Sequence, residues 1–152
     1  KHNLKGYNTD YYGFKKAIKP FLKPQHKKAL ILGTGGASKA VAYALHELEV
    51  EYKFVSRSPS ENQFSYEDLN ASIFADFHVV INCTPTGTFP NVEESPPLPY
   101  SLFSKNHLAF DLIYNPAKTS FLKKAKEFNA ETINGYQMLV FQAEKAWKIW
   151  NK

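Results

Sequence analysis

The sequence predicts an α/β fold, a doubly wound and mostly parallel sheet with helices on both faces. Strand-like and helix-like patterns alternate along the chain, as they do where each strand of a parallel sheet is followed by a covering helix. Residues 78–82 carry a continuous apolar run, which is typical of a strand buried on both faces. The length of 152 residues and the hydrophobic content of 43% suit one domain with a real core.

In the first half of the chain we expect a helix, a strand, a second helix and a second strand. The first helix begins after Thr9-Asp10, has its apolar stripe between 14 and 22, and stops at Pro24. Strands are expected at 29–32 and 52–55. The helix between these strands turns one apolar stripe inward: Ala37, Val41, Ala44, Leu45 and Leu48.

The middle of the chain is expected to be less regular. A short edge strand is predicted at 63–65 and a weak helix at 67–74, before the buried strand at 78–82. The segment 84–99 contains five prolines, Pro85, Pro90, Pro96, Pro97 and Pro99, which exclude regular structure and predict a loop over the sheet edge.

The second half completes the sheet with a strand at 108–112, a helix at 121–128 and a short strand before Asn134. In the C-terminal helix that follows, Trp147 and Trp150 are expected to lie in the core or an interface. About six strands in the order 3-2-1-4-5-6 would then form a Rossmann-like sheet. This order places a ligand crevice at the carboxyl ends of the first and fourth strands.

The turn after the first strand, Gly33-Thr34-Gly35-Gly36-Ala37-Ser38, predicts a phosphate cradle. Gly33 suits a tight turn with positive φ, and Gly35 lets the backbone approach a ligand closely. The helix that starts at Ala37 offers free N–H groups and the positive end of its dipole to a diphosphate. Ser38 replaces the third glycine of the usual fingerprint, so the glycines alone leave a plain strand-to-helix turn open as the alternative.

The end of the second strand favours NADP over NAD. A site for NAD usually has an acidic residue there, whereas this chain has Ser56-Arg57-Ser58. A guanidinium offers a fork of donors and a fixed charge to a 2′-phosphate, and Ser58 adds a hydroxyl. The alternative is that Arg57 is one more exposed base, and Glu61 would weaken the NADP hypothesis if it turned inward.

Composition argues against several other classes of protein. The net charge of +5 comes from lysines spread over several expected helices, which does not favour a nucleic-acid-binding protein. No apolar run approaches the roughly 18 residues of a membrane span, and the N-terminus does not resemble a signal peptide, so we expect a cytoplasmic protein with no membrane partner. A single cysteine, Cys83, and histidines without ligand spacing predict no metal site.

Three further segments carry a family resemblance: Gly6–Phe14, with the pattern N-T-D-x-x-G-F, Asn82–Gly87, and Asn134–Ala143, with M-L-V-x-Q-A. Together with Asp111–Pro116 and the glycine turn, they resemble the cofactor-binding half of shikimate dehydrogenase over nearly the whole chain. The resemblance implies an oxidoreductase that reversibly reduces 3-dehydroshikimate to shikimate with NADPH, in chorismate and aromatic amino-acid biosynthesis.

The resemblance also implies roles for individual residues. Asp10 matches the family's catalytic aspartate, which binds a substrate hydroxyl beside a lysine, and Tyr114 and Gln142 match substrate-binding positions. Without the family, Thr9 or Asp10 could cap the first helix, Tyr114 could be a packed aromatic and Gln142 an ordinary polar helix position. The matching cofactor positions are Gly33, Thr34, Gly35, Gly36, Ala37, Ser56, Arg57, Ser58, Cys83, Thr84, Leu112, Gly135 and Met138.

We therefore expect residues 1–152 to be an NADP-binding Rossmann domain, with the helices in 1–23 and 135–152 lying towards a substrate domain. In the family that amino-terminal domain carries a serine pair and the catalytic lysine, and this chain begins after both; Lys1 and Lys5 do not match the lysine's context. The chain alone is expected to bind cofactor without turnover. Ser56, where the family often has Asn, and Glu61, near the place of a second base, predict a weaker NADP preference. A quinate/shikimate dehydrogenase using NAD(P) and a non-catalytic nucleotide-binding regulatory module stay open as alternatives.

Overall fold

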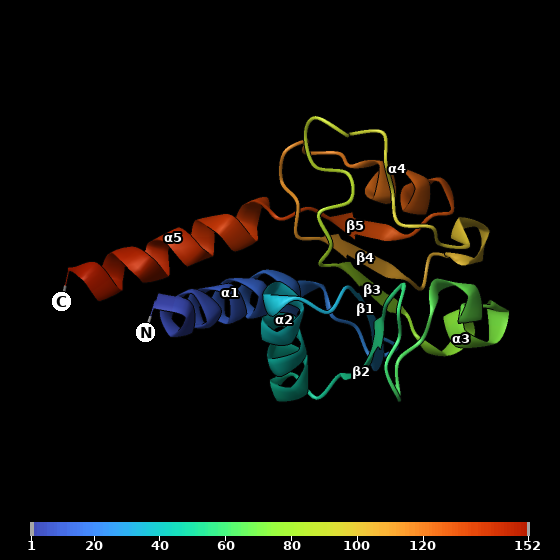
Figure 1. Cartoon of the computed structure of the whole chain (residues 1–152), viewed down its shortest axis with the longest axis horizontal. Coiled ribbons are helices and arrows are strands. Elements are labelled where there is room, and N and C mark those ends of the chain that lie inside the picture. Colours follow the sequence, from blue (N-terminus) through green and yellow to red (C-terminus); the bar gives the residue numbers. More distant parts are fainter. Residues whose placement is uncertain (1, 152) are drawn as a thin grey trace.

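A computed structural model describes residues 2–151 of the chain, with side chains from Thr9 onward. Within this part, one parallel sheet of five strands has the order β2-β1-β3-β4-β5 (Figure 1). The strands are β1 (Lys28–Leu32), β2 (Glu51–Val55), β3 (Val79–Asn82), β4 (Leu108–Asp111) and β5 (Glu131–Ile133). The α-helices are α1 (His2–Ile18), α2 (Gly36–Glu47), α3 (Ala71–Asp76), α4 (Ser120–Glu127) and α5 (Tyr136–Trp150).

Helices cover both faces of the sheet, as the α/β prediction requires. Successive residues of a strand point to opposite faces, so Ala29 and Ile31 of β1 join one buried cluster, whereas Leu30 and Leu32 join the other. The first cluster includes Phe14 of α1 and residues of α2 and α5, and the second includes residues of α3 and α4. The doubly wound, Rossmann-like fold is therefore confirmed.

The predicted edge strand at 63–65 is reduced to a single bridge, so the count of about six strands was wrong by one. Phe64 pairs with β2 through two backbone hydrogen bonds: its N–H donates to Phe54 O at 3.0 Å, and Ser56 N donates to its carbonyl at 2.9 Å. Ser65 then caps a short 3-10 helix, since its hydroxyl accepts from Asp68 N at 3.2 Å. This cap turns the chain out of the sheet after one bridge. The other five strands keep the predicted order.

Helix α1 begins earlier than predicted, at His2, so Thr9 and Asp10 lie inside the helix. The interpretation of either residue as an N-cap is therefore wrong. The extension accompanies close packing of α1 against α5: a Cβ atom at Gly13 would lie 2.6 Å from the Met138 carbonyl oxygen. The spacing of apolar residues in α1 does not by itself show that α5 packs against it. The family motif's residues 6–8, like Lys1 and Lys5, lie outside the part whose side chains are described.

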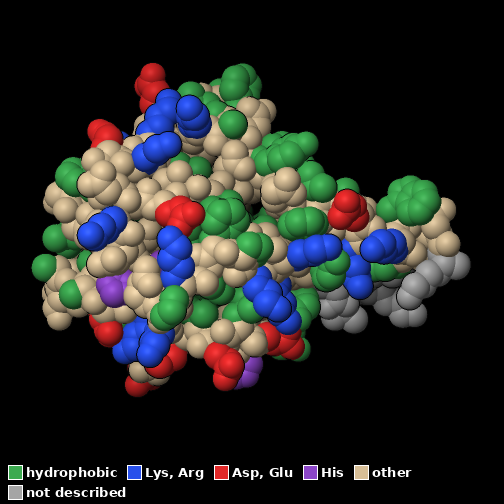
Figure 2. Space-filling view, turned by 180° about the vertical axis from the view of Figure 1, so that it is seen from behind, with side chains coloured by type: hydrophobic (Ala, Val, Ile, Leu, Met, Phe, Trp, Pro, Cys, Tyr) green, Lys and Arg blue, Asp and Glu red, His purple; other side chains and the backbone are tan. Residues whose placement is uncertain are grey.

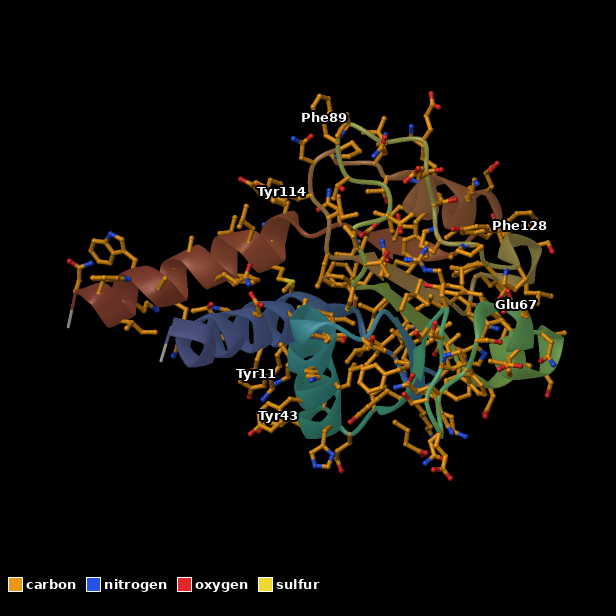
Figure 3. The ribbon with its side chains drawn as sticks, in the orientation of Figure 1. Tyr11, Tyr43, Glu67, Phe89, Tyr114 and Phe128 are labelled. Carbon is orange, nitrogen blue, oxygen red and sulfur yellow. The ribbon has the colours of Figure 1, made fainter. Side chains whose placement is uncertain are left out.

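Helices α1 and α5 continue together beyond the sheet as a projecting arm (Figure 1). Trp147 and Trp150 on this arm are 67% and 81% exposed, so of the two predicted settings, core or interface, the core is excluded. Figure 2 shows basic and hydrophobic side chains together along the arm. At the other side of α1, Tyr11 faces Tyr43 of α2, with ring centroids 4.9 Å apart (Figure 3).

The remaining segments follow the predictions with one change. The proline-rich segment 84–99 contains no helix or strand. The predicted helix at 67–74 is split into the 3-10 helix Tyr66–Asp68 and α3, because the Asn70 side chain accepts from Ile73 N at 3.0 Å and starts a new helix. Among residues 2–151, no helix has both the length and the apolar character needed to span a membrane.

Candidate functional site

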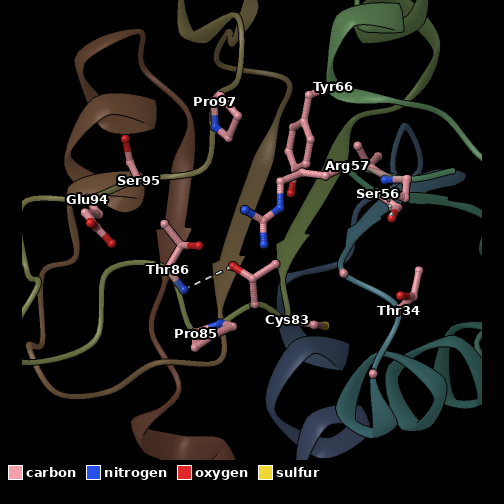
Figure 4. Close-up of a pocket in the computed structure, with 15 residues that line it drawn as sticks. Thr34, Ser56, Arg57, Tyr66, Cys83, Pro85, Thr86, Glu94, Ser95 and Pro97 are labelled. Atoms are coloured by element: carbon pink, nitrogen blue, oxygen red, sulfur yellow. Dashed lines mark hydrogen bonds between the residues drawn. The ribbon is translucent and has the colours of Figure 1, made fainter.

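A cavity of about 800 Å³ opens at the carboxyl ends of β1, β2 and β3 (Figure 4). One wall comes from the loops after β1 and β2, and the other from the proline-rich segment 84–99. Eight of the predicted cofactor residues line this cavity: Gly33, Thr34, Gly35, Ser56, Arg57, Ser58, Cys83 and Thr84. The fold therefore brings together residues from three separate segments of the sequence.

The glycine turn has two parts with different steric demands. Gly33 has φ +107°, and its N–H donates to Val55 O at 3.0 Å, so the backbone itself requires glycine at this position. Gly35 precedes the first turn of α2 with φ −79°, and a Cβ atom at Gly35 or Gly36 would meet nothing within 4 Å. The protein thus leaves open space at the N-terminus of α2, where free N–H groups attract anions.

Ser38 replaces the third fingerprint glycine without disturbing the turn. Its side chain is buried, and its hydroxyl donates to Gly35 O at 2.6 Å. A residue this small allows α2 to pack closely on the sheet, and the hydrogen bond fixes the turn to the helix.

Arg57, the one arginine in the sequence, extends along the ring of Tyr66 towards the cavity (Figure 4). Ser56 Oγ accepts from Ser58 N at 3.1 Å, which holds this segment in a tight turn. Among the side chains described, no carboxylate lies within salt-bridge distance of the guanidinium. Glu61 is exposed and does not line the cavity. Arg57 is therefore available to an anionic ligand.

A buried polar pair lies beneath the cavity, where β3 and β4 end. Asn82 and Asp111 are partners in the strand register, both have 0% exposure, and Asn82 Nδ2 donates to Asp111 Oδ1 at 3.1 Å. The Asn82 side-chain oxygen accepts from Thr84 N at 3.0 Å and Thr84 Oγ1 at 2.6 Å. Asn82 therefore fixes the first residues of the loop that forms the second wall.

Asp111 organises the loop after β4 in the same way. Its carboxylate accepts from Ile113 N at 3.0 Å and from Thr119 Oγ1 at 2.7 Å, and Thr119 in turn caps α4 by accepting from Leu122 N at 3.2 Å. Burial raises the pKa of Asp111 to about 6, although these hydrogen bonds favour the charged form. The buried carboxylate thus links the loop after β3 to the loop after β4.

A second cavity of about 650 Å³ continues the first along the sheet edge. The two cavities share Cys83, Thr84 and Pro85, and the second is also lined by Ala37, Leu112 and Tyr114. Tyr114 lies near the start of α5 (Figure 3). Burial raises the pKa of the Cys83 thiol far above its usual range, so Cys83 is a small neutral wall group. The two cavities together form an elongated groove.

Three predicted cofactor residues, Gly36, Gly135 and Met138, line neither cavity. Met138 is buried in the core. Gly135 has a packing role: a Cβ atom there would lie 1.9 Å from the Leu112 carbonyl oxygen. The glycine lets the start of α5 lie directly against the loop after β4.

Asp10 and Gln142, 132 residues apart in sequence, meet between α1 and α5. Gln142 Nε2 donates to Asp10 Oδ1, and burial raises the pKa of Asp10 while this bond opposes the rise. The pair lines neither cavity of the groove, whereas Tyr114 stands on the groove wall. The structure therefore brings together two of the three predicted substrate residues.

Several residues of the first cavity were not predicted from the sequence: Tyr66, Pro85, Thr86, Glu94, Ser95 and Pro97. Apart from Tyr66, they belong to the segment from Thr84 to Pro99. The family motif Asn82–Gly87 covers the start of this segment, and for the rest only its length indicated a functional loop.

A parallel sheet with a glycine turn after its first strand, and a groove across the strand ends, defines a Rossmann domain of the dinucleotide-binding class. No protein-family model matches the chain. The chain is 38% identical over 156 residues to "Shikimate dehydrogenase (NADP(+))" of Clostridium botulinum strain Hall, covering 97% of this chain and 60% of that protein. It is 39% identical over 160 residues to the protein of the same name from Methanococcus maripaludis, covering 95% and 57%.

Among solved structures, the shikimate dehydrogenase of Thermus thermophilus, crystallised with NADP(H) and shikimate, superposes with a TM-score of 0.78 at 32% identity. That match covers 93% of this chain and 56% of the Thermus chain. Over nearly its whole length, the chain is therefore similar to one part of the shikimate dehydrogenases. It spans about 60% of the length of the curated relatives it matches.

Proposed function

We propose that this chain is the NADP(H)-binding domain of a shikimate dehydrogenase, which reversibly reduces 3-dehydroshikimate to shikimate. The observation that carries the proposal is the open space over Gly35 and Gly36 at the N-terminus of α2, beside the groove. A fold that needed these glycines for its own packing would place atoms near their missing side chains. The space instead fits a diphosphate held by the backbone N–H groups of α2.

The rest of the groove supports the same assignment. Arg57 and the hydroxyls of Ser56 and Ser58 would hold a 2′-phosphate at the end of β2, since a guanidinium pairs with phosphate by charge and by geometry. The second cavity, between Ala37, Leu112 and Tyr114, would take the nicotinamide half. When bound, the cofactor supplies the hydride, and these protein groups orient it and limit access of water.

Asp10 and Gln142 are proposed to bind the substrate. Gln142 holds one carboxylate oxygen of Asp10, which orients the other towards a substrate hydroxyl. The raised pKa of Asp10 suits a group that shares a proton with that hydroxyl. Hydride transfer also needs a proton donor close to the substrate ketone. We propose that a lysine in a separate substrate domain of the whole protein supplies it, beside Asp10.

The arm formed by α1 and α5 is proposed to pack against that substrate domain. The arm projects beyond the sheet (Figure 1). Trp147 and Trp150 on this arm are exposed to solvent. Large exposed aromatic side chains are typical of surfaces that another domain covers. This proposal keeps residues 1–152 as one cofactor domain, with 1–23 and 135–152 facing its partner domain.

The cofactor assignment is tested by Gly35→Ala in the chain as it exists. A methyl group in the open space should weaken NADP⁺ binding about tenfold or more, while the free energy of unfolding changes by about 1 kcal/mol or less. Calorimetry is the suitable readout, because both tryptophans lie on the arm and are poor reporters of the groove. NADP⁺ binding equal to that of the wild type would exclude the glycine turn as the cradle, and a wild type that binds no NADP⁺ would refute the cofactor assignment.

Selection for the 2′-phosphate is tested by Arg57→Ala. In this variant the dissociation constant for NADP⁺ should rise about tenfold or more, and that for NAD⁺ should rise much less. Lys19→Ala, which removes an exposed positive charge outside the groove, is the control for net charge. Equal losses for both nucleotides would argue against a 2′-phosphate contact. Assays of the full-length protein on shikimate and quinate then separate the proposed enzyme from a quinate dehydrogenase, and no turnover on either would favour a non-catalytic module.

A further inference from the structure

The larger cavity of the groove is lined by two charged side chains of opposite sign among the described residues, Arg57 and Glu94. Figure 4 shows them on opposite walls, with Arg57 on the β2 side and Glu94 on the proline-rich side. Neither forms an ion pair with the other or with another described side chain. An anion placed against Arg57 therefore lies across the cavity from an unneutralised carboxylate.

The loop holds Glu94 at this position through its neighbours. Gly87 has φ +104°, and a Cβ atom there would lie 3.1 Å from the Glu94 carbonyl oxygen, so the chain crosses itself closely at this point. Ser95 Oγ accepts from Lys124 Nζ of α4 at 2.9 Å. Leu98, a few residues later, is buried in the core. These contacts anchor the backbone of the segment, which keeps Glu94 on the cavity wall.

We propose that Glu94 is a specificity-determining residue that reduces the preference of this groove for the 2′-phosphorylated cofactor, so that NAD⁺ also binds. This inference rests on the proposed function and adds a specificity determinant to it. Arg57 attracts a 2′-phosphate, and the Glu94 carboxylate repels the same dianion across the cavity. NAD⁺ lacks this phosphate, whereas the diphosphate is common to both nucleotides. The ratio of the two dissociation constants therefore isolates the effect of Glu94 on the 2′-phosphate.

The experiment measures NADP⁺ and NAD⁺ binding by calorimetry for the wild type, Glu94→Gln and Glu94→Lys at pH 8. For a carboxylate and a phosphate dianion about 10 Å apart in water, loss of the carboxylate should raise the preference for NADP⁺ about threefold at 0.01 M salt. Glu94→Lys changes the charge by twice as much, so it should raise the preference about tenfold. Both gains should fade towards 1 M salt, where the screening length falls to about 3 Å.

Glu93→Gln is the matched control. Glu93, the neighbour of Glu94, is exposed like it, but it lines a different hollow, with Pro116 and Lys118. The control removes the same charge one residue away, and it should leave the ratio of the two dissociation constants close to that of the wild type. A rise of equal size in Glu93→Gln would assign the effect to net charge and overturn the proposal.

The remaining outcomes separate this inference from the cofactor assignment. If the wild type binds NADP⁺ and Glu94→Gln leaves the ratio unchanged, Glu94 has no influence on the 2′-phosphate and only this inference fails. If Glu94→Gln weakens the binding of both nucleotides equally, Glu94 contacts the part that they share, and this result also overturns the inference. A wild type that binds neither nucleotide contradicts the proposed function itself.

Discussion

Replacing Asp111 by asparagine should change the pH dependence of unfolding in a defined direction. Asp111 is fully buried, and burial raises the pKa of its carboxyl from 3.8 to about 6 in the folded protein. Between these two pH values the folded state therefore binds more protons than the unfolded state. Stability from this group is fully present below pH 3.8 and is lost as the pH rises through 6.

The size of the effect follows from the pKa change. Each pH unit corresponds to about 1.4 kcal/mol, so a rise from 3.8 to about 6 amounts to about 3 kcal/mol over the whole range. Between pH 7 and pH 5 the same two values give the wild type a relative gain of about 1.3 kcal/mol from Asp111. An asparagine side chain at this position does not titrate, so the variant has no such gain.

Urea unfolding of the wild type and Asp111→Asn from pH 5 to pH 8 measures this difference directly. The free energy of unfolding of the variant, relative to the wild type, should fall by about 1.3 kcal/mol as the pH is lowered from 7 to 5. Loss of the acceptor for Thr119 Oγ1 shifts the whole curve without changing its slope. Thr119→Ser, which keeps the hydroxyl, should run parallel to the wild type. A constant difference between Asp111→Asn and the wild type across this range would refute the reasoning.

Three further predictions concern stability. Gly135→Ala should lower the free energy of unfolding by about 3 kcal/mol, because its Cβ atom would lie 1.9 Å from the Leu112 carbonyl oxygen. Gly36→Ala should change the free energy of unfolding by about 1 kcal/mol or less, and thermal unfolding compares the two variants. Burial lowers the pKa of His107, so its contribution is present above pH 6.5 and lost as the pH falls below it; His107→Gln should flatten this loss in urea titrations. Phe110→Ala should cost about 3 to 5 kcal/mol in the same assay, because Phe110 has 0% exposure.

The elements of the fold were largely predictable because they depend on local pattern. A run of apolar residues predicts the strand β3, and a stripe of apolar residues predicts the helix α2. Both patterns can be recognised without knowing which elements pack against them. The errors arose where a competing interaction decides. The cap at Ser65 ended a strand after one bridge, and the contact between Gly13 and α5 accompanies a helix that starts before its apolar stripe.

The site was predictable in part for the same reason. The glycine turn and Arg57 follow strands directly, so the parallel sheet places them at one edge. Asn82 and Asp111 end neighbouring buried strands, and a hydrogen bond between them could have been expected from that position. Glu94 could not, because its place in the cavity depends on the path of an irregular loop held by contacts with α4.

The glycines show how the structure separates two causes that look the same in sequence. Gly33 and Gly135 are required by the protein itself, the first by its positive φ and the second by the carbonyl of Leu112. Gly35 is required by neither, since its backbone angles suit other residues and nothing lies within 4 Å of its missing Cβ atom. A glycine without a structural need, beside a helix N-terminus and a groove, is best explained by a ligand that approaches the backbone. Alanine substitutions at these positions should therefore affect different properties: folding at Gly135, and nucleotide binding at Gly35.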